Sequence, residues 1–468
     1  MPLNVVIVGA GIAGLSTAIS LRRAGHVVSI YEKSALNNEV GAAVTLPPNS
    51  SRAVVAWGVD PVASRFVLAK GIEIGVGATL GQIDYTPLGD WVGHVFGVPF
   101  YFAHRVDLHE ALKVLATGDE GVGKPAVIHL KSAVASYDPE TPSITLQNGQ
   151  VITADLVIAA DGIHSIGIET VLGHVNKPQP QDLYNGCYRF LIPAADLDND
   201  PETAFWNKDN ANDGKMRIYS NGKLANRFVS YPCRNHEIWN CVGMFHDPDL
   251  KAATHEDWHA PVDKSNLLNS FPDLHPSLRA VLNKATEVKR WPLLYRRPVP
   301  TWTKSKLVAV GDAAHPMLPH QGQGASQGIE DALALGIALC GAEKSQIEQR
   351  LAVFEKARRN RASAIQIMSN ASLENPDLIE EEVRRFVDVV PSEYSIFLSP
   401  KQHEKKKRAD EEMIGTGKEV SEFNWGCDIA RVTEELVREV SPGFKVPEGF
   451  WRASPYMPAR PVNGNGKI

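Results

Sequence analysis

A glycine pattern near the N-terminus constrains this chain more than any other feature. A short apolar run, Val5–Val8, precedes Gly9, Gly11 and Gly14, which follow the spacing Gly-x-Gly-x-x-Gly. The run is too short for a helix and rich in β-branched side chains, as is typical of a strand buried on both faces. Such glycines permit a tight turn, a close approach of the backbone to a pyrophosphate, and close packing of the next helix on the strand. The pattern predicts a dinucleotide-binding βαβ unit.

An acidic residue completes this unit. Val27–Tyr31 has the composition of a second strand, and Glu32 follows it directly. A carboxylate at this position accepts hydrogen bonds from a ribose and favours a free 2′-hydroxyl over a 2′-phosphate. The first helix would direct its unpaired N–H groups at the phosphates. The alternative is a glycine-rich turn that binds nothing, and the order of strand, glycines, helix, strand and acid disfavours it.

Composition excludes several classes of protein. The 468 residues are 43% hydrophobic and 22% charged, as in ordinary globular proteins of two or three domains. A net charge of −6 gives no sign of a nucleic-acid partner. The longest uncharged apolar run, Ala332–Ala342, is about half of the roughly 20 residues that a membrane span needs. We therefore expect no membrane span.

The cysteines and the N-terminus favour a reduced compartment. The five cysteines include no Cys-x-x-Cys pair, and no basic leader precedes the first strand. His236, Cys241 and His246 fall in a strand-like segment whose alternation separates their side chains, so we expect no metal site. We expect a cytoplasmic protein that is a monomer or a homodimer.

Two further segments have recognisable local patterns. His104–Ala116 reads as an amphipathic helix, in which Asp107 would be the N-cap and Glu110 its capping-box partner. Gly118–Lys124 matches the phosphate-loop pattern Gly-x₄-Gly-Lys, but Pro125 stands where serine or threonine is required. We interpret this second segment as a surface loop.

Two aspartates follow buried strands later in the chain. Asp161 ends an apolar run and precedes Gly162, and Asp312 follows a second run and Gly311. Because open α/β sheets bind ligands at the carboxyl ends of their strands, we expect both carboxylates at one ligand site. Prolines and glycines after Asp312 would form a rigid loop that passes close to a flat ring, with a helix N-terminus beyond it.

With these motifs the chain resembles the single-component flavoprotein aromatic hydroxylases, in particular salicylate hydroxylase and its fungal relatives. Four segments carry the resemblance, which covers roughly residues 3 to 370. They are GAGIAG from Gly9, HRVDLHEAL from His104, ADLVIAADGIHS from Ala154 and VGDAAHPMLPHQGQGASQGIEDA from Val310. The last of them is the most specific.

The resemblance implies FAD as the cofactor and NAD(P)H as a co-substrate. It assigns the glycines and Glu32 to the ADP half of FAD, Arg105 and Asp312 to its phosphate and ribityl region, and Asp161 to FAD and NAD(P)H. The predicted cofactor-binding residues are Gly9, Gly11, Ala13, Gly14, Glu32, Lys33, Arg105, Asp161, Asp312, Gly322, Gly324 and Ala325. The alternatives are an ordinary helix-terminal arginine, a helix cap for Asp312 and a turn residue for Asp161.

The resemblance also implies candidate catalytic residues. Tyr231 and Arg189 would lie in the sheet that faces the flavin, and His315 near the face of the ring. A tyrosine or an arginine there can hold a phenolate or a carboxylate; the alternatives are a packing role or a place on the surface. The chain departs from the family at Ala42–Val44, where glycine-isoleucine is usual, and its last hundred residues fit only loosely.

The expected fold is α/β, with a Rossmann-like FAD-binding domain, an interleaved and mostly antiparallel β-sheet substrate domain, and a helical C-terminal region. We expect the FAD-binding domain at residues 1–175, with inserted strands at about 70–100, and at 296–370. The substrate domain would be residues 176–295 and the helical region 371–468.

The implied reaction is that of an FAD-dependent monooxygenase. NAD(P)H would reduce FAD, O₂ would form a flavin C4a-hydroperoxide, and a small phenolic or aromatic-acid substrate would be hydroxylated, with or without decarboxylation. An FAD-dependent dehydrogenase, oxidase or epoxidase of a secondary-metabolite pathway is the alternative enzyme. A flavin-binding regulatory or scaffold protein is the non-enzymatic alternative. Oxygen incorporation separates the enzymes, and NAD(P)H turnover excludes the scaffold.

Overall fold

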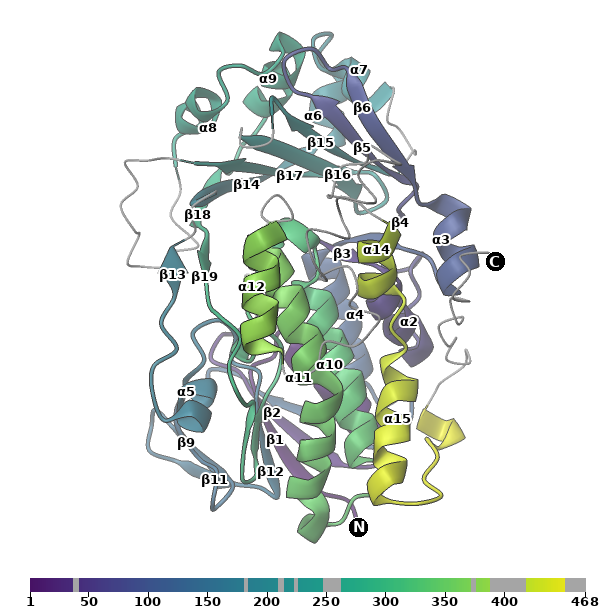
Figure 1. Cartoon of the computed structure of the whole chain (residues 1–468), viewed down its shortest axis with the longest axis vertical. Coiled ribbons are helices and arrows are strands. Elements are labelled where there is room, and N and C mark those ends of the chain that lie inside the picture. Colours follow the sequence, from purple (N-terminus) through teal and green to yellow (C-terminus); the bar gives the residue numbers. More distant parts are fainter. Residues whose placement is uncertain are drawn as a thin grey trace.

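The computed structural model describes residues 1–36, 42–180, 184–208, 214–222, 226–246, 262–371, 376–387 and 418–450. These residues form an elongated molecule with a sheet at each end and long helices beside the lower sheet (Figure 1). The fold is mixed α/β, as the sequence predicts, and the lower sheet has the Rossmann-type parallel arrangement. No helix in the ranges above is long and apolar enough to cross a membrane.

The lower sheet has six strands in the order β20-β21-β12-β1-β2-β8. All neighbours are parallel except β20 and β21. The strands are β1 (Asn4–Val8), β2 (Val27–Tyr31), β8 (Val127–His129), β12 (Leu156–Ala159), β20 (Thr303–Lys304) and β21 (Leu307–Ala309). Apolar side chains of β1, β12 and β21 are almost completely buried, as expected for central strands covered on both faces.

The upper sheet has seven strands in the order β18-β14-β17-β16-β15-β5-β6. It is antiparallel except for the parallel pair β15 and β5. The strands are β5 (Gly71–Val76), β6 (Gln82–Pro87), β14 (Gly186–Pro193), β15 (Lys215–Ser220), β16 (Arg227–Cys233), β17 (Ile238–Phe245) and β18 (Lys289–Pro292). Strands from two distant parts of the sequence therefore share one sheet.

Alternation along these strands gives the upper sheet two faces. The outer face, with Tyr188, Phe190 and Trp239, forms a core with four helices that cover the top of the molecule (Figure 1). These helices are α6 (Ala194–Asp198), α7 (Ala204–Lys208), α8 (Lys264–Ser270) and α9 (Pro276–Asn283). The inner face points toward the lower sheet, and its Val242 packs against Leu318.

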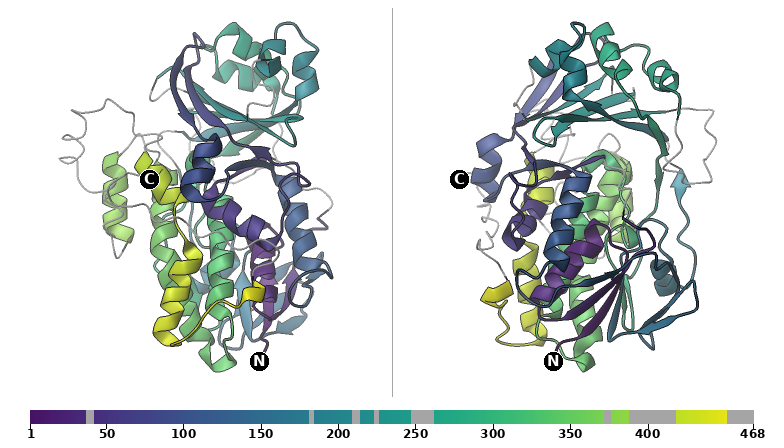
Figure 2. Two further views of the ribbon diagram at one scale, coloured as in Figure 1. Left: turned by 90° about the vertical axis from the view of Figure 1, so that its right-hand side faces the viewer. Right: turned by 180° about the vertical axis from the view of Figure 1, so that it is seen from behind.

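Helices α10 (Gly324–Leu339) and α11 (Ile347–Ala371) stand side by side next to the parallel sheet (Figure 1). α10 packs closely on α1 (Ile12–Arg23), because a Cβ at Gly336 would lie 2.0 Å from Ser20 Oγ. The other α-helices in the described ranges are α2 (Pro48–Trp57), α3 (Gly89–Phe96), α4 (Arg105–Thr117), α5 (Ile166–Leu172), α12 (Pro376–Phe386), α14 (Lys418–Trp425) and α15 (Ile429–Val440). α14 and α15 run along the side of the molecule opposite α5 (Figures 1 and 2).

The described residues form three smaller sheets in addition to the lower and upper sheets. One is an antiparallel meander of β9 (Val134–Asp138), β10 (Ser143–Leu146) and β11 (Val151–Thr153). Another has β7 (Tyr101–His104) between β3 (Ala43–Leu46) and β4 (Val67–Leu68), and β13 (Gln179–Pro180) pairs with β19 (Leu294–Tyr295). The domain boundaries at 175, 295 and 370 remain our proposal.

Candidate cofactor and substrate site

Four neighbouring strands of the parallel sheet end at one edge with residues predicted to bind the cofactor. In sheet order these strands are β2, β1, β12 and β21, and they are followed by Glu32, Gly9, Asp161 and Asp312. Their carboxyl ends coincide because the strands are parallel. Three carboxylates therefore lie along the edge on which the glycine loop opens, which is where open α/β sheets bind ligands.

The three glycines of the loop have different surroundings. Gly9 has a φ of +101°, and a Cβ there would lie 2.3 Å from Ala160 O. A Cβ at Gly14 would lie 2.0 Å from Gly9 O, so these two glycines are required by the fold itself. Apart from its two neighbours in the chain, no residue that the structure describes has a heavy atom within 4 Å of the Cβ position of Gly11. Gly11 thus borders open space at the N-terminus of α1, a cradle that a pyrophosphate fits.

Glu32 is held beside this loop. Its carboxylate accepts hydrogen bonds from Ala10 N at 2.8 Å and from Ser34 N at 2.7 Å. The adjacent Lys33 is exposed. Ala13 lies between Gly311 and α10, since its methyl group is 2.6 Å from the Cβ position of Gly311 and 3.0 Å from that of Gly328. Glu32 therefore has a fixed orientation, whereas Ala13 packs the helices together.

Arg105 and Asp312 approach the loop from two other elements. Arg105 is the first residue of α4, one turn before His109, whose Nε2 lies 2.7 Å from Ala10 O. Residues one turn apart share a helix face, so Arg105 lies on the loop side of α4. Asp312 is surrounded by protein yet reaches solvent, as a group on the floor of a concave site does. Its carboxylate is 3.9 Å from the Cβ position of Gly324, at the start of α10.

The charges around Asp312 include one residue that the motifs do not mark. Burial raises the pKa of Asp312, and the nearby side chains of His315, Arg105 and Arg296 oppose this rise. Arg296 is buried and comes from the segment after β19. The sequence marks Arg296 by no motif, since it lies in the segment between β19 and β20. We add Arg296 to the candidate cofactor site.

Asp161 is oriented by two donors. Its Oδ2 accepts hydrogen bonds from the Tyr137 hydroxyl at 2.9 Å and from Gly167 N at 3.2 Å. Its Oδ1 is buried and has no hydrogen-bond partner among the residues that the structure describes. Burial raises the pKa of the carboxyl group. A buried acceptor without a donor at the ligand edge of a sheet is a position where a bound hydroxyl or amide would supply one.

The loop between Asp312 and α10 is fixed from several sides. Gly322 has a φ of +61°, and its carbonyl oxygen accepts a hydrogen bond from Thr45 Oγ1 at 2.8 Å. Pro316 O accepts one from Gln366 Nε2 at 3.1 Å. Gly324 and Ala325 begin α10 and are half-buried, so the helix N-terminus remains accessible. We refer to residues 316–324 as the 316–324 loop.

The candidate catalytic residues differ in accessibility. Arg189 lies on the inner face of the upper sheet, with its guanidinium 4.4 Å from the ring centre of Trp291. Its Nε is buried and has no hydrogen-bond partner within the described ranges. Tyr231 is buried, and its hydroxyl donates to Ala43 O at 3.0 Å. Burial, partly opposed by Arg189, raises the pKa of Tyr231 well above its ordinary value.

His315 points away from the site. Its side chain is completely buried, and its Nε2 lies 2.6 Å from Asp331 Oδ2 on α10. Its ring packs against Trp302 at 4.9 Å between ring centres. The structure thus brings Arg189 close to Tyr231, whereas His315 belongs to the interior beneath the loop.

A second histidine of the same motif, His320, lies on the side of the loop that faces Tyr184. The ring of His320 lies 5.6 Å from that of Tyr184, and the Arg227 guanidinium lies over the same tyrosine at 5.6 Å. Both ring nitrogens of His320 are buried, with no hydrogen-bond partner in the described part of the chain. Burial, reinforced by Arg227, lowers its pKa to about 3. His320 is therefore a neutral imidazole whose two ring nitrogens can both form hydrogen bonds to a ligand. The sequence motif contains both histidines and did not indicate that His320, rather than His315, is the candidate site residue.

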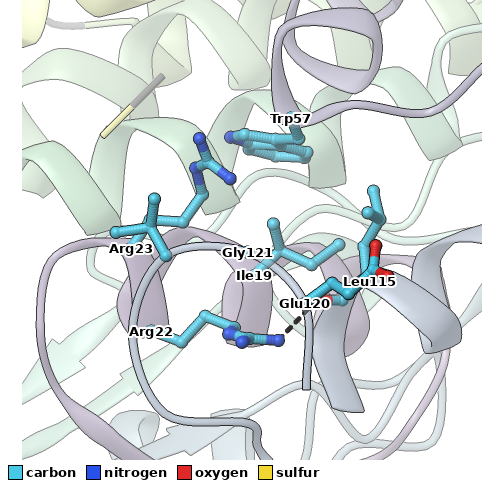
Figure 3. A pocket seen from close by; sticks show the side chains of 8 residues that line it. Ile19, Arg22, Arg23, Trp57, Leu115, Glu120 and Gly121 are labelled. Atoms are coloured by element: carbon cyan, nitrogen blue, oxygen red, sulfur yellow. Dashed lines mark hydrogen bonds between the residues drawn. The ribbon is translucent and has the colours of Figure 1, made fainter. Parts of the chain in front are cut away.

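A narrow crevice at the opposite end of α1 is not part of this site (Figure 3). It lies between Trp57 and the loop that carries Glu120 and Gly121. Arg22 donates to Leu115 O, Gly118 O and Gly123 O at 2.8 to 3.0 Å. The segment Gly118–Lys124, which matches the phosphate-loop pattern, therefore presents carbonyl groups to Arg22 rather than N–H groups to a phosphate.

The chain belongs to the FAD binding domain family, whose match covers residues 2–369. The FAD-dependent monooxygenase cfoG of Aspergillus candidus is 40% identical over 96% of this chain and 98% of its own length. Hispidin-3-hydroxylase of Neonothopanus nambi is 35% identical over 78% of this chain and 86% of its own length. The resemblance to flavoprotein hydroxylases is confirmed, and so are the FAD cofactor and the monooxygenase class.

A solved structure gives the same fold. A salicylate hydroxylase substrate complex superimposes with a TM-score of 0.67 at 23% identity, and the match covers 93% of this chain and 98% of that one. The open space at Gly11, the accessible carboxylate of Asp312 and the unsatisfied oxygen of Asp161 lie along one sheet edge. These features fit a dinucleotide that carries a second ring system at the 316–324 loop.

Proposed function

We propose that this protein is an NAD(P)H- and O₂-dependent monooxygenase that hydroxylates an anionic or phenolic aromatic ring. Arg189 is the observation that carries the proposal. Its guanidinium stacks on Trp291 on the inner face of the upper sheet, and no carboxylate in the described ranges pairs with it. A flat aromatic wall beside an unpaired cation suits a planar anion.

The cofactor would be held by the residues along the sheet edge. The open side of Gly11 would accept the pyrophosphate, Glu32 a ribose hydroxyl, and Asp312 with Arg105 and Arg296 the ribityl and phosphate groups. When bound, FAD supplies hydride acceptance from NAD(P)H and the activation of O₂. The N-terminus of α10 would stabilise negative charge that develops next to it.

The protein's own side chains would orient the substrate and control its charge. Arg189 would favour the ionised form of a phenol or acid, because an adjacent cation lowers the free energy of the anion. His320 would give one hydrogen bond to a ring substituent, and as a neutral group it would leave the charge to Arg189. Apolar Val242 and Met244 on the same face would exclude water.

The two remaining candidates would act through other residues. Tyr231 would hold the strand at Ala43 in position, and His315 would fix Asp331 beneath the 316–324 loop. Decarboxylation would accompany hydroxylation only if the substrate carries its carboxylate at the carbon that is attacked. Dehydrogenation, oxidation or epoxidation on the same cofactor is the competing function.

Oxygen labelling tests this function. Aromatic acids and phenols are first screened for those that stimulate NAD(P)H oxidation, and active ones are then incubated under ¹⁸O₂. We expect one labelled atom in the product for each NAD(P)H consumed. A fully coupled product without label would mean that the enzyme is a dehydrogenase or oxidase.

A pair of arginine variants tests the substrate site. Arg189→Met keeps a long side chain beside Trp291 but removes the charge, so KM for an acidic substrate should rise about 10- to 100-fold, by the typical strength of a charged hydrogen bond. Arg290→Met is the matched control, because Arg290 lies over Phe245 on the outer face of the same sheet. Equal effects of the two substitutions would remove Arg189 from the site.

A further inference from the structure

Helix α14, in the C-terminal part of the chain, touches the 316–324 loop. Asn424, near the end of α14, donates a hydrogen bond from its Nδ2 to Gln321 Oε1 at 3.2 Å. Gln321 directly precedes Gly322, at the point where the loop turns through a positive φ. The family match ends at residue 369, so this contact comes from a part of the chain outside the shared FAD-binding domain.

A buried arginine holds α14 in this position. Arg361 of α11 donates from Nε and Nη2 to the two carboxylate oxygens of Glu330, each at 2.8 Å. It also donates to Phe423 O at 2.7 Å and to Asn424 O at 2.9 Å. A single planar guanidinium therefore connects α10, α11 and the C-terminal carbonyls of α14, where a cation also interacts favourably with the helix dipole.

Glu330 connects the same network to the loop from below. Its carboxylate is completely buried and accepts further hydrogen bonds from Asn49 Nδ2 at 2.6 Å and from Gln327 Nε2 at 3.0 Å. Asn49 Nδ2 also donates to Gln323 Oε1 at 3.0 Å, one residue before α10. The loop is thus held at Gln323 from beneath and at Gln321 from α14.

Apolar contacts fix the other side of α14. Trp425 packs edge-on against Phe96 and Phe100, with ring centres 5.9 and 5.4 Å apart. Arg52 donates to Cys427 O at 3.0 Å. α14 is therefore anchored on two sides, and the side chain of Asn424, which is 3% exposed, points from this anchored helix to the loop.

We propose that Asn424 is a positioning residue for the 316–324 loop, so that α14 sets the placement of this loop against the flavin ring. The inference rests on the proposed function only in that it takes FAD chemistry as the reaction. The hydrogen bond between Asn424 and Gln321 is present whether or not a substrate is turned over. Helix α14 thus supports the 316–324 loop.

Spectroscopy of the bound flavin tests this role in the full-length holoprotein. Asn424→Leu keeps the size of the side chain and removes the donor, which should alter the visible circular dichroism of bound FAD and raise its dissociation constant about 3- to 10-fold, as for one lost hydrogen bond. Thr433→Val is the matched control. It removes one buried hydrogen bond, from Thr433 Oγ1 to Ile429 O, within α15 and away from the loop.

A double variant separates positioning from general destabilisation. Gln321→Leu removes the partner from the loop side, and it remains informative if Asn424→Leu does not fold. We expect Gln321→Leu to give the same spectral change, and the double variant to be no worse than either single one. The inference fails if the flavin spectrum and dissociation constant of Asn424→Leu match those of Thr433→Val, or if the effects of the two leucines multiply. Neither measurement uses a substrate, so a failure here is distinct from a failure of the ¹⁸O₂ experiment.

Discussion

The hydroxyl group of Tyr231 donates a hydrogen bond to the backbone oxygen of Ala43 at 3.0 Å. From the next strand, Asn240 Oδ1 accepts a hydrogen bond from the N–H group of the same alanine at 2.9 Å. Two inner-face side chains of the upper sheet therefore hold both polar backbone atoms at the start of β3. Because β3 pairs with β7, which leads directly into Arg105, this clamp links the substrate side of the molecule to the cofactor side.

Tyr231→Phe should weaken this clamp without emptying the cofactor site. The buried carbonyl of Ala43 loses a donor, so the free energy of unfolding should fall by about 1–3 kcal/mol. FAD content should stay normal and the substrate-stimulated rate should stay within about threefold of the parent protein, an effect below 1 kcal/mol. Denaturant unfolding and steady-state kinetics measure the two quantities. A large loss of rate with unchanged stability would show that the hydroxyl group contacts the substrate.

Gly11→Ala and Gly14→Ala should have opposite consequences. Gly11 has an ordinary φ of −74° and open space at its Cβ position, so alanine should fold there, but its methyl group should lower FAD affinity by about 5- to 150-fold. Gly14→Ala directs its methyl group at Gly9 O and should destabilise the fold by about 1–3 kcal/mol or more. Thermal unfolding of the apoprotein and FAD titration distinguish the two. Equal loss of stability in both variants would contradict the assignment of Gly11 to the ligand.

His104 should make the fold sensitive to mild acid. Burial, reinforced by Arg234 and opposed by Asp107, lowers its pKa from 6.5 to about 4. The unfolded chain therefore binds a proton below pH 6.5 that the folded chain takes up only near pH 4. Stability should fall between these two pH values, by up to about 3 kcal/mol for this residue. His104→Gln should lose less stability in this interval than the parent protein, whereas His94→Gln, at an exposed position, should follow the parent curve.

The local motifs of the cofactor site could be predicted from the sequence. Glycine spacing, buried strands and the aspartates that follow them depend on neighbouring residues, and the backbone places Gly9, Glu32, Asp161 and Asp312 along one edge. Asp107 shows the limit of this approach. The pattern predicts a helix cap, which is wrong, because the N-cap is His104, without a side-chain bond, and the Asp107 carboxylate binds Arg65 and Arg234.

Side-chain contacts between residues far apart in the sequence could not be predicted from local patterns. Arg234 lies 127 residues from Asp107 and reaches it only through the β16–β17 turn, where Arg234, Asn235 and His236 all have φ between +52° and +64°. His315 and His320 belong to one motif, yet His315 turns toward Asp331 and His320 toward Tyr184. These choices depend on α10 and the upper sheet, which no local pattern contains.

Glu330→Gln should be among the most destabilising single substitutions in the chain. The carboxylate is completely buried, and although burial alone would raise its pKa, Arg361 and Arg358 hold it below its usual range. Replacing it with a neutral amide leaves the buried Arg361 without its counter-charge and leaves Arg358 with Asp331 alone, at a cost of about 3–5 kcal/mol. Glu435→Gln breaks an exposed pair with Arg431 and should cost less than about 0.5 kcal/mol. Denaturant unfolding of both variants gives the comparison, and a cost below about 1 kcal/mol for Glu330→Gln would mean that the network beneath the 316–324 loop does not stabilise the fold.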